Sequence, residues 1–508
     1  MTESTKAFAK AFSGYSLGVL LSRISGMFRD IALAFFFGTS SELALFMVAY
    51  RFANLMRRML AESPLASSFI PLFASLKGPQ EEGRFFRDVF FSFALIAAAL
   101  VACGMGGLFW GGKLFMGDVS EVSQLTQIML PSLFFICLYG VCSSFLQCEK
   151  KFFLPAVAPV AFNVVWILAA WGAYRSAATS SMRFLSYGVI VAFAMQWLLL
   201  MPEVMRILRL SLTWQECSKP RPFHSALKGM VKPFILGTLG IGAAQINIAL
   251  DSIFARIADP EGPALLWYAI RIEQVPVALF GVAIASAILP TLTRTIQQGS
   301  EKRELLIEGV KQTFSLMSFS MFGLFALGYL TVSLLFGHGK FQGGSIAHTT
   351  TCLYSYALGL IPHGLTLLLA SVYYAHKDFK TPMRASLLAV ACNAILNAIM
   401  VFVLHWGAES IALGTSLTSA FNGWYLYHRL KSLEESSFSL GLFYLKTLLC
   451  GAAACFCVWL CKLAQGSQFV MWGVGVCVYM GSYLLFEKLL GCQQLTKIVQ
   501  VCIKKAKT

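Results

Sequence analysis

Arginine residues inside long apolar runs are the feature of this sequence with the clearest chemical meaning. An ionisable group within a membrane span costs about 2.5–3.5 kcal/mol on insertion scales, and such groups usually face a water-filled cavity. A guanidinium stays charged and donates in a planar fork that matches phosphate oxygens. Because arginines outnumber carboxylates in these runs, we expect a cationic cavity that binds an anionic, phosphate-bearing ligand. The residues concerned are Arg23, Arg29, Asp30, Arg51, Arg57, Arg58, Glu62, Asp251, Arg271 and Glu273.

A plainer interpretation exists for some of these side chains. Arg57 and Arg58 stand near the end of a run, where a long side chain can snorkel to the membrane surface. Arg29 and Asp30 are adjacent and can form a local neutral pair. Arg23, Arg29 and Arg271 lie deeper in their runs, so a role in a cavity is at least as well supported for them as a structural one.

Membrane-spanning helices are the elements that must position these residues. The chain of 508 residues is 57% hydrophobic and 13% charged, whereas soluble domains carry roughly 25% charged residues. Residues 89–112 form an uncharged run, which is longer than the roughly 20 residues that a spanning helix needs. These solid apolar blocks exclude the weak alternation of a membrane β-barrel. The predicted fold class is an all-α polytopic membrane protein.

The net charge and the cysteines do not indicate another class. A charge of +16 is typical of some nucleic-acid-binding proteins, but here the basic residues form short clusters between apolar runs, so we expect no nucleic-acid partner. The 14 cysteines lie mostly within the runs and show no metal-site spacing. The N-terminal residues lack the pattern of a cleavable signal peptide.

Apolar runs bounded by charge, Gly or Pro predict about fourteen spans. Lys and Arg gather in alternate loops, whereas the intervening loops hold only Lys113, Arg175, Arg183, Arg256, Lys340 and Lys462. Since cytoplasmic loops are enriched in these residues, both termini are expected in the cytoplasm. The predicted spans are 15–37, 43–64, 88–112, 125–147, 154–174, 184–205, 233–256, 264–290, 312–336, 348–374, 384–404, 408–428, 442–462 and 469–489.

An internal repeat relates the two halves of the chain. ALFMVAYRFANLM from Ala44 aligns with ALLWYAIRIEQVP from Ala264, so that Arg51 meets Arg271 and Asn54 meets Gln274. KKFFLP and KDFKTP form a weaker second match. The offset corresponds to six spans, an even number, which predicts parallel repeats with a substrate near mid-membrane. We therefore expect two six-helix lobes, residues 1–215 and 216–432, followed by two C-terminal helices in residues 433–508.

Several segments carry a family resemblance that extends over essentially the whole chain. The most specific is SRISGMFRDIALAFFFG, residues 22–38, followed by FMVAYRFANLMRRMLAES, WYAIRIEQVP, ILPTLTR and YYAHKDFKTP. These segments resemble the MurJ (MviN) family of lipid II flippases, within the multidrug/oligosaccharidyl-lipid/polysaccharide exporter superfamily. The resemblance implies a fourteen-span, two-lobe transporter of the bacterial inner membrane, not an enzyme, that moves an undecaprenyl-diphosphate-linked peptidoglycan precursor by alternating access.

The resemblance also implies which residues bind the substrate. Arg23, Arg29 and Arg57 match the family's cavity arginines of the first lobe, and Arg271 matches that of the second. Asn54 and Glu62 match as well, and Gln274 is the repeat partner of Asn54. Lipid II and membrane lipids are the expected partners, and the last two spans would form a groove for the polyprenyl tail. We expect a monomer and no organic cofactor.

Departures from the family pattern concern its acidic and small residues. Ala44 and Ile270 stand where the family commonly has Asp, Ala264 stands where it has Ser, and Ser63 replaces a Gly. These differences affect acid–base or gating chemistry rather than the cationic cavity.

Some relatives bind Na⁺ in the second lobe, and this sequence holds suitable oxygen donors. Asp251, Asn393, Asn397 and Thr415 offer the carboxylate, amide and hydroxyl oxygens that suit a hard cation. Asn393 and Asn397 are four residues apart and so share one helix face. Hydrogen bonding between helices is the alternative role for the same residues.

Two further functions remain open from sequence. An exporter of another polyprenyl-linked glycan would have the same cationic cavity. A membrane glycosyltransferase would need Asp-rich metal-binding loops, and the largest loops, near 206–232 and 294–311, hold no such cluster.

Overall fold

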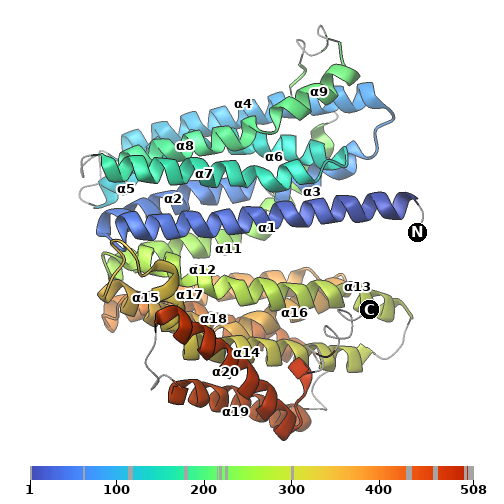
Figure 1. Ribbon diagram of the computed structural model, residues 1–508. Helices are drawn as coiled ribbons and strands as arrows, with labels where there is room; N and C mark the ends of the chain where they lie inside the picture. The colour runs from blue at the N-terminus through green and yellow to red at the C-terminus, as the bar shows by residue number, and fades with distance from the viewer. Residues whose placement is uncertain are drawn as a thin grey trace. The chain divides into compact units, whose positions relative to one another are not determined.

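In the computed structural model, helices account for the secondary structure of the described residues (Figure 1). The described residues are 3–60, 63–112, 118–176, 181–213, 216, 220–222, 227–298, 302–430, 437–461, 467–496 and 500. The all-α fold class predicted from the sequence is confirmed. Within these ranges the chain divides into two compact units, residues 1–252 and 253–508, which we call the N-terminal unit and the C-terminal unit.

The N-terminal unit is a bundle of long helices. Helix α1 packs along α7, α7 packs on α8, and α4 and α3 both pack on α6. Figure 1 shows α1, α7 and α8 running side by side along their length. The helices are α1 (Glu3–Phe37), α2 (Ser41–Leu60), α3 (Ser63–Phe73), α4 (Pro79–Gly112), α5 (Asp118–Met129), α6 (Ser132–Cys148), α7 (Phe153–Arg175), α8 (Ser181–Leu198), α9 (Met201–Ser211) and most of α11 (Lys228–Ala258).

The C-terminal unit is built around α14, which packs against α15, α16, α19 and α20. Helix α17 pairs with α18, and α19 pairs with α20. The helices are α12 (Gly262–Pro276), α13 (Val282–Gln298), α14 (Lys302–Phe336), α15 (Gly344–Ala357), α16 (Leu360–Ala375), α17 (Lys380–Ala398), α18 (Ala408–Arg429), α19 (Ser437–Cys461) and α20 (Gln468–Leu490). Two π-helical turns, Val277–Gly281 and Ile399–Val403, follow α12 and α17.

Each of the fourteen predicted spans coincides with a helix or with a pair of consecutive helices. Among the described residues, 9 helical segments are long and apolar enough to cross a membrane, and two bent pairs, α5 with α6 and α15 with α16, raise the number to 11. The remaining three predicted spans correspond to α1, α2 and α18. In α1 and α2, the arginines that suggest function also lower the hydropathy.

The turn before α7 and the turn before α17 have the same unusual geometry. Lys150 and Lys377 both adopt left-handed backbone angles, with φ of 58° and 60°. The next amide donates back to the preceding helix in both turns, from Lys151 to the Leu146 carbonyl at 2.8 Å and from Asp378 to the Tyr373 carbonyl at 2.9 Å. These are the 6→1 bonds of a Schellman helix end. The KKFFLP–KDFKTP match is therefore a structural repeat as well as a sequence repeat.

The division into residues 1–215, 216–432 and 433–508 stays a prediction.

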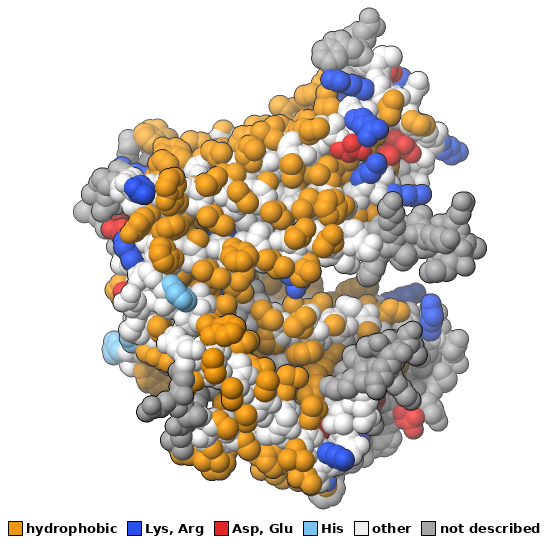
Figure 2. Space-filling view, viewed as in Figure 1, with side chains coloured by type: hydrophobic (Ala, Val, Ile, Leu, Met, Phe, Trp, Pro, Cys, Tyr) orange, Lys and Arg blue, Asp and Glu red, His pale blue; other side chains and the backbone are white. Residues whose placement is uncertain are grey.

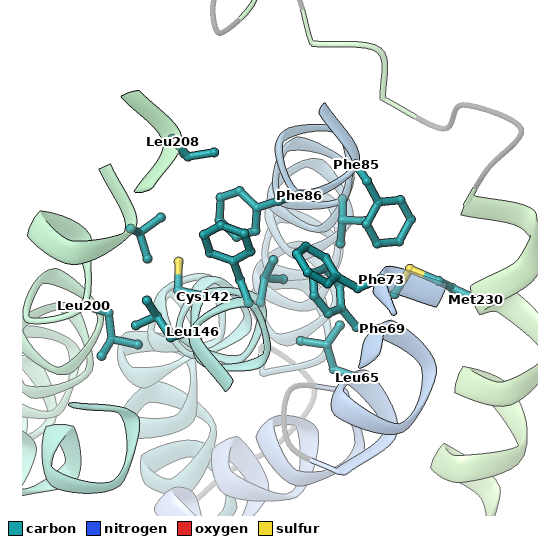
Figure 3. Packing of buried hydrophobic residues seen from close by; sticks show 14 of the residues in the cluster. Leu65, Phe69, Phe73, Phe85, Phe86, Cys142, Leu146, Leu200, Leu208 and Met230 are labelled. Atoms are coloured by element: carbon teal, nitrogen blue, oxygen red, sulfur yellow. The ribbon is translucent and has the colours of Figure 1, made fainter. Parts of the chain in front are cut away.

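Aromatic and aliphatic side chains fill the core of the N-terminal unit at one end of the bundle. Phe69 and Phe73 of α3 meet Phe85 of α4, and Phe86 lies 4.2 Å from the ring of Phe145 (Figure 3). Met230, near the start of α11, packs at the edge of this cluster (Figure 3). Figure 2 shows hydrophobic side chains across the middle of the helices of this unit and charged side chains toward their ends, as a bilayer requires.

Candidate functional site

The most buried of the predicted arginines is Arg29 in α1, whose residue is 8% exposed. Its Nε and Nη2 donate to Oδ1 of Asp30 at 3.0 and 2.8 Å, and its Nη1 donates to Oδ1 of Asn163 at 3.2 Å. The guanidinium carbon lies 5.0 Å from the ring of Trp166. The guanidinium of Arg29 is thus paired with the Asp30 carboxylate, hydrogen-bonded to the Asn163 side-chain amide and stacked on the Trp166 indole.

Small residues in α1 allow α7 to bring these partners close. At Gly18 a Cβ would lie 2.7 Å from Cβ of Ala156, nearer than side chains normally approach. At Gly26 a Cβ would lie 3.7 Å from Nδ2 of Asn163, an ordinary contact distance, so Gly18 is the position that requires a small residue. Close approach of this kind is the usual role of small residues in membrane helices.

Asn163 joins Arg29 to the backbone of α1. Its Nδ2 donates to Oγ of Ser25 at 2.8 Å and to the Ser22 carbonyl at 3.3 Å, while its Oδ1 accepts from Arg29. This one amide therefore uses both ends to fix the rotamer of the buried arginine. Trp166 is completely buried, and its ring packs 4.8 Å from that of Tyr50 in α2.

The second arginine cluster of the N-terminal unit lies on α2. Nε of Arg57 donates to Oδ1 of Asn54 at 2.6 Å, one helical turn earlier. The Arg57 guanidinium lies 5.8 Å from the ring of Phe193 in α8. Arg57 and Asn54 are both partly exposed.

The remaining predicted binding residues of the N-terminal unit are Arg23 and Glu62. Arg23 of α1 is exposed. It is two helical turns from Arg29 but does not share the network of that residue. Glu62 lies outside the described residues.

In the C-terminal unit, Arg271 lies on α12 over an indole ring. Its guanidinium carbon is 4.3 Å from the centroid of Trp267, one turn earlier in the same helix. Glu273 is buried at 8% exposure, whereas Gln274, the repeat partner of Asn54, is exposed. The guanidinium of Arg271 is thus stacked on an indole ring, a favourable cation–π contact.

The polar residues predicted to hold Na⁺ are mostly buried. Asn393 and Asn397 of α17 are 1% and 0% exposed, and Oδ1 of Asn393 accepts from Oγ1 of Thr418 in α18 at 3.3 Å. Gly414 of α18 makes room for the asparagines, because a Cβ there would lie 2.5 Å from Oδ1 of Asn397.

Two further residues complete the predicted Na⁺ set. Thr415 donates to the Ile411 carbonyl at 3.0 Å within α18. Asp251, the last predicted ligand, belongs to the N-terminal unit, where its Oδ2 accepts from Nδ2 of Asn247 at 3.1 Å. Within the part of the chain that the structure describes, no group of three or more His, Cys, Asp or Glu side chains is arranged to hold a metal ion.

Sequence reasoning missed the residues that position the arginines. Asn163 and Trp166 come from α7, which carries no charge in its interior, and only the packing of α7 on α1 brings them to Arg29. The contact of Trp267 with Arg271 could have been predicted from the sequence, because residues four apart in a helix lie on the same face.

Comparison with known proteins places the chain in a family. The model of the family described as "Lipid II flippase MurJ" matches residues 33–482. The chain belongs to the MurJ family. A relative named probable lipid II flippase MurJ, from Chlamydia trachomatis, is 32% identical over 409 residues, which cover 79% of this chain and 74% of the relative. One with the same name from Thermotoga maritima is 28% identical over 96% of this chain and 97% of its own length.

Solved structures agree on the fold. The structure described as lipid II flippase MurJ in an inward closed conformation matches with a TM-score of 0.76 at 24% identity, over 94% of this chain and 98% of its own. An inward-facing MATE transporter of the MOP superfamily matches with a TM-score of 0.64 at 13% identity, over 84% and 99%. The fold is therefore that of MurJ- and MATE-type transporters rather than of a membrane enzyme, and the chain is a multi-pass membrane protein.

Proposed function

We propose that this chain is a lipid II flippase, which carries the undecaprenyl-diphosphate-linked peptidoglycan precursor across the bacterial inner membrane. The observation that carries the proposal is the family match over residues 33–482, which includes most of both units. The Thermotoga maritima relative, named probable lipid II flippase MurJ, covers 96% of the chain.

The chemistry of the arginines supports a diphosphate-bearing substrate. Arg271 is stacked on Trp267 and Arg57 is held by Asn54, so both guanidiniums are oriented before a ligand arrives. A preoriented guanidinium loses less conformational entropy when it binds a phosphate. We assign Arg57 and Arg271 to direct contact with the diphosphate headgroup, and Arg23 to an exposed position where it can attract that headgroup.

Arg29 has a different role in this proposal. Its charge is already balanced by Asp30 at 2.8 Å, so it adds little net attraction for an anion. We propose that it is a positioning residue, which fixes α1 against α7 near the substrate path. Asn163 and Trp166 share this role.

The alternating distribution of Lys and Arg supports a topology with both termini in the cytoplasm. Cysteine labelling in intact cells tests this topology. A single cysteine introduced at residue 3 or 508 of an otherwise cysteine-free protein is expected to react only after the cells are permeabilised. Labelling of either cysteine in intact cells would contradict the proposed cytoplasmic location of that terminus.

We further propose that Na⁺ is the coupling ion. Asn393, Asn397 and Thr415 supply oxygen atoms on two packed helices, and oxygen donors suit a hard cation. Replacement of Na⁺ by K⁺ is expected to slow lipid II flipping by the wild type, and Asn393→Leu is expected to abolish that difference. Equal flipping rates in the two salts would exclude the role.

The proposed function is tested by reconstitution. Purified protein in liposomes is expected to move fluorescent lipid II to the leaflet where an added reductant or enzyme can reach it, and the same gene is expected to rescue a bacterium depleted of its own flippase. A protein that moves a different polyprenyl-linked glycan and fails in both assays with lipid II would contradict the proposal.

A further inference from the structure

An apolar cavity of about 230 Å³ lies in the N-terminal unit, and none of the arginines discussed above lines it. Three helices form its walls, with Ile96, Ala97 and Leu100 on α4, Cys137 on α6, and Val231 and Phe234 on α11. Phe93 and Phe234 close one side, where their rings meet edge to face at 5.6 Å.

The lining calls for an apolar occupant. The one hydroxyl among the lining side chains, that of Ser92, already donates to the Asp88 carbonyl at 2.6 Å. Water needs two or more polar partners to stay in a cavity, and apolar cavities remain dry. Packed protein interiors hold few voids larger than a water molecule. Ile96, Leu100 and Val231 are 40%, 41% and 53% exposed, so the cavity opens on an exposed apolar surface of α4 and α11.

Basic side chains stand at one end of this cavity. Lys228 and Lys232 lie one turn apart on α11, beside the lining residue Val231, and both are exposed. The nearby carboxylates are already engaged by other groups. Asp88, one turn before Ser92, pairs with Arg87 at 2.7 Å and also accepts from the Arg221 amide, and Glu216 pairs with Arg84. The two lysines are therefore a positive surplus next to the entrance of an apolar cavity.

We propose that this cavity binds an acyl chain of an anionic phospholipid, with the phosphate of the headgroup held by Lys228 and Lys232. An apolar slot next to basic residues at one membrane face is the arrangement that recognises such lipids. Residues 92–100 of α4 extend for about 12 Å at 1.5 Å per residue, which accommodates part of one acyl chain rather than a long polyprenyl tail. The bound lipid acts as a structural partner of α4 and α11 and is not the transported substrate.

Native mass spectrometry of the full-length protein in detergent tests the proposal, with phosphatidylglycerol and phosphatidylcholine as the two probes. The wild type is expected to retain phosphatidylglycerol in preference to phosphatidylcholine. Removal of both lysines in Lys228→Gln/Lys232→Gln is expected to lower phosphatidylglycerol affinity by about fivefold per lysine and to leave phosphatidylcholine unchanged. Lys488→Gln, an exposed lysine in the last turn of α20, is the matched control and is expected to change neither affinity.

A second pair of variants tests the cavity itself. Ala97 is buried in the lining, so Ala97→Leu fills the space, whereas Ala98→Leu adds the same atoms to an exposed position of the same helix. Ala97→Leu is expected to weaken binding of both lipids by about tenfold, and Ala98→Leu is expected to leave it unchanged. Thermal unfolding of each variant in lipid-free detergent identifies any variant that does not fold, in which case the lysine pair decides.

Three results would overturn the proposal. The first is equal binding of the two phospholipids by the wild type. The second is an equal effect of Ala97→Leu and Ala98→Leu. The third is displacement of phosphatidylglycerol by undecaprenyl phosphate in the wild type but not in Ala97→Leu, because that result would assign the cavity to substrate-type chains instead.

Discussion

The ion pair of Arg29 and Asp30 allows the sharpest quantitative prediction, because both residues are nearly inaccessible, at 8% and 2% exposure. Removing one partner of a buried pair leaves an uncompensated charge and costs about 3–5 kcal/mol. Arg29→Gln and Asp30→Asn are therefore each expected to lower the free energy of unfolding by about that amount.

The double variant Arg29→Gln/Asp30→Asn should behave differently. It leaves two neutral amides that can still hydrogen-bond with each other and with Asn163, so its loss is expected to be about 1–2 kcal/mol. Denaturant unfolding in a fixed detergent, followed by tryptophan fluorescence, gives the four free energies of a double-mutant cycle. Asn163→Leu, which removes an acceptor that Arg29 uses at 3.2 Å, should cost about 1–3 kcal/mol.

Additive effects of the two single changes would refute this reasoning, because they would mean that Arg29 and Asp30 do not compensate each other. A flipping assay on the double variant separates structure from transport. If Arg29 only positions α1 against α7, the double variant retains most of its flipping rate once it is folded. If the charge of Arg29 binds the headgroup directly, the double variant folds but does not flip lipid II.

Three other predictions follow from the geometry. Gly18→Leu should lower the free energy of unfolding by about 1–3 kcal/mol, because the added side chain forces α1 away from α7. Gly14→Ala adds a Cβ that would lie 3.8 Å from that of Phe153, so it should leave stability unchanged. Thermal unfolding of both variants in detergent checks this pair. Lys150→Gly and Lys377→Gly should each raise stability by about 1 kcal/mol, because φ is positive at both, and Val at either position should lower it. The Thr213 amide and Arg84 hold the pKa of the Glu216 carboxylate at about 2, below its usual value of 4.5, so the ion pair of Glu216 with Arg84 should be complete above pH 4.5 and lost as the pH falls through 2, which a carbon-13 NMR titration of that carboxylate checks. Glu216→Gln should remove this transition, and a transition at the same pH in that variant would contradict the assignment to Glu216.

Much of the fold could be predicted from sequence because a membrane imposes a simple rule on it. Backbone groups in lipid must be satisfied within each helix, so apolar length alone locates most spans, and Lys and Arg between them check the count. The breaks within spans could not be predicted from the sequence in the same way. The break between α5 and α6 falls at Pro131, and the two helices are bent by 43°, but a proline alone does not say whether a helix kinks or ends.

Only those contacts of the candidate site that lie within one helix could be predicted from the sequence. Arg57 and Asn54 are neighbours on one helix, as are Arg271 and Trp267, so their pairing follows from helical spacing. Asn163 is 134 positions from Arg29 in sequence. No local pattern connects them, and only the packing of α1 on α7 does.

The assignment of Arg271 to the phosphate-bearing headgroup is tested most directly by comparing two arginines that share one local geometry. Arg271 lies 4.3 Å from the ring of Trp267, and Arg175 lies 5.5 Å from the ring of Trp171 at the end of α7, each four residues after its Trp. Lipid II flipping in proteoliposomes should fall by at least about tenfold in Arg271→Gln, since a charge-assisted hydrogen bond contributes about 1.5–3 kcal/mol, and it should be unchanged in Arg175→Gln. Equal flipping rates in wild type and Arg271→Gln, with both proteins folded, would contradict the proposal that this arginine binds the diphosphate.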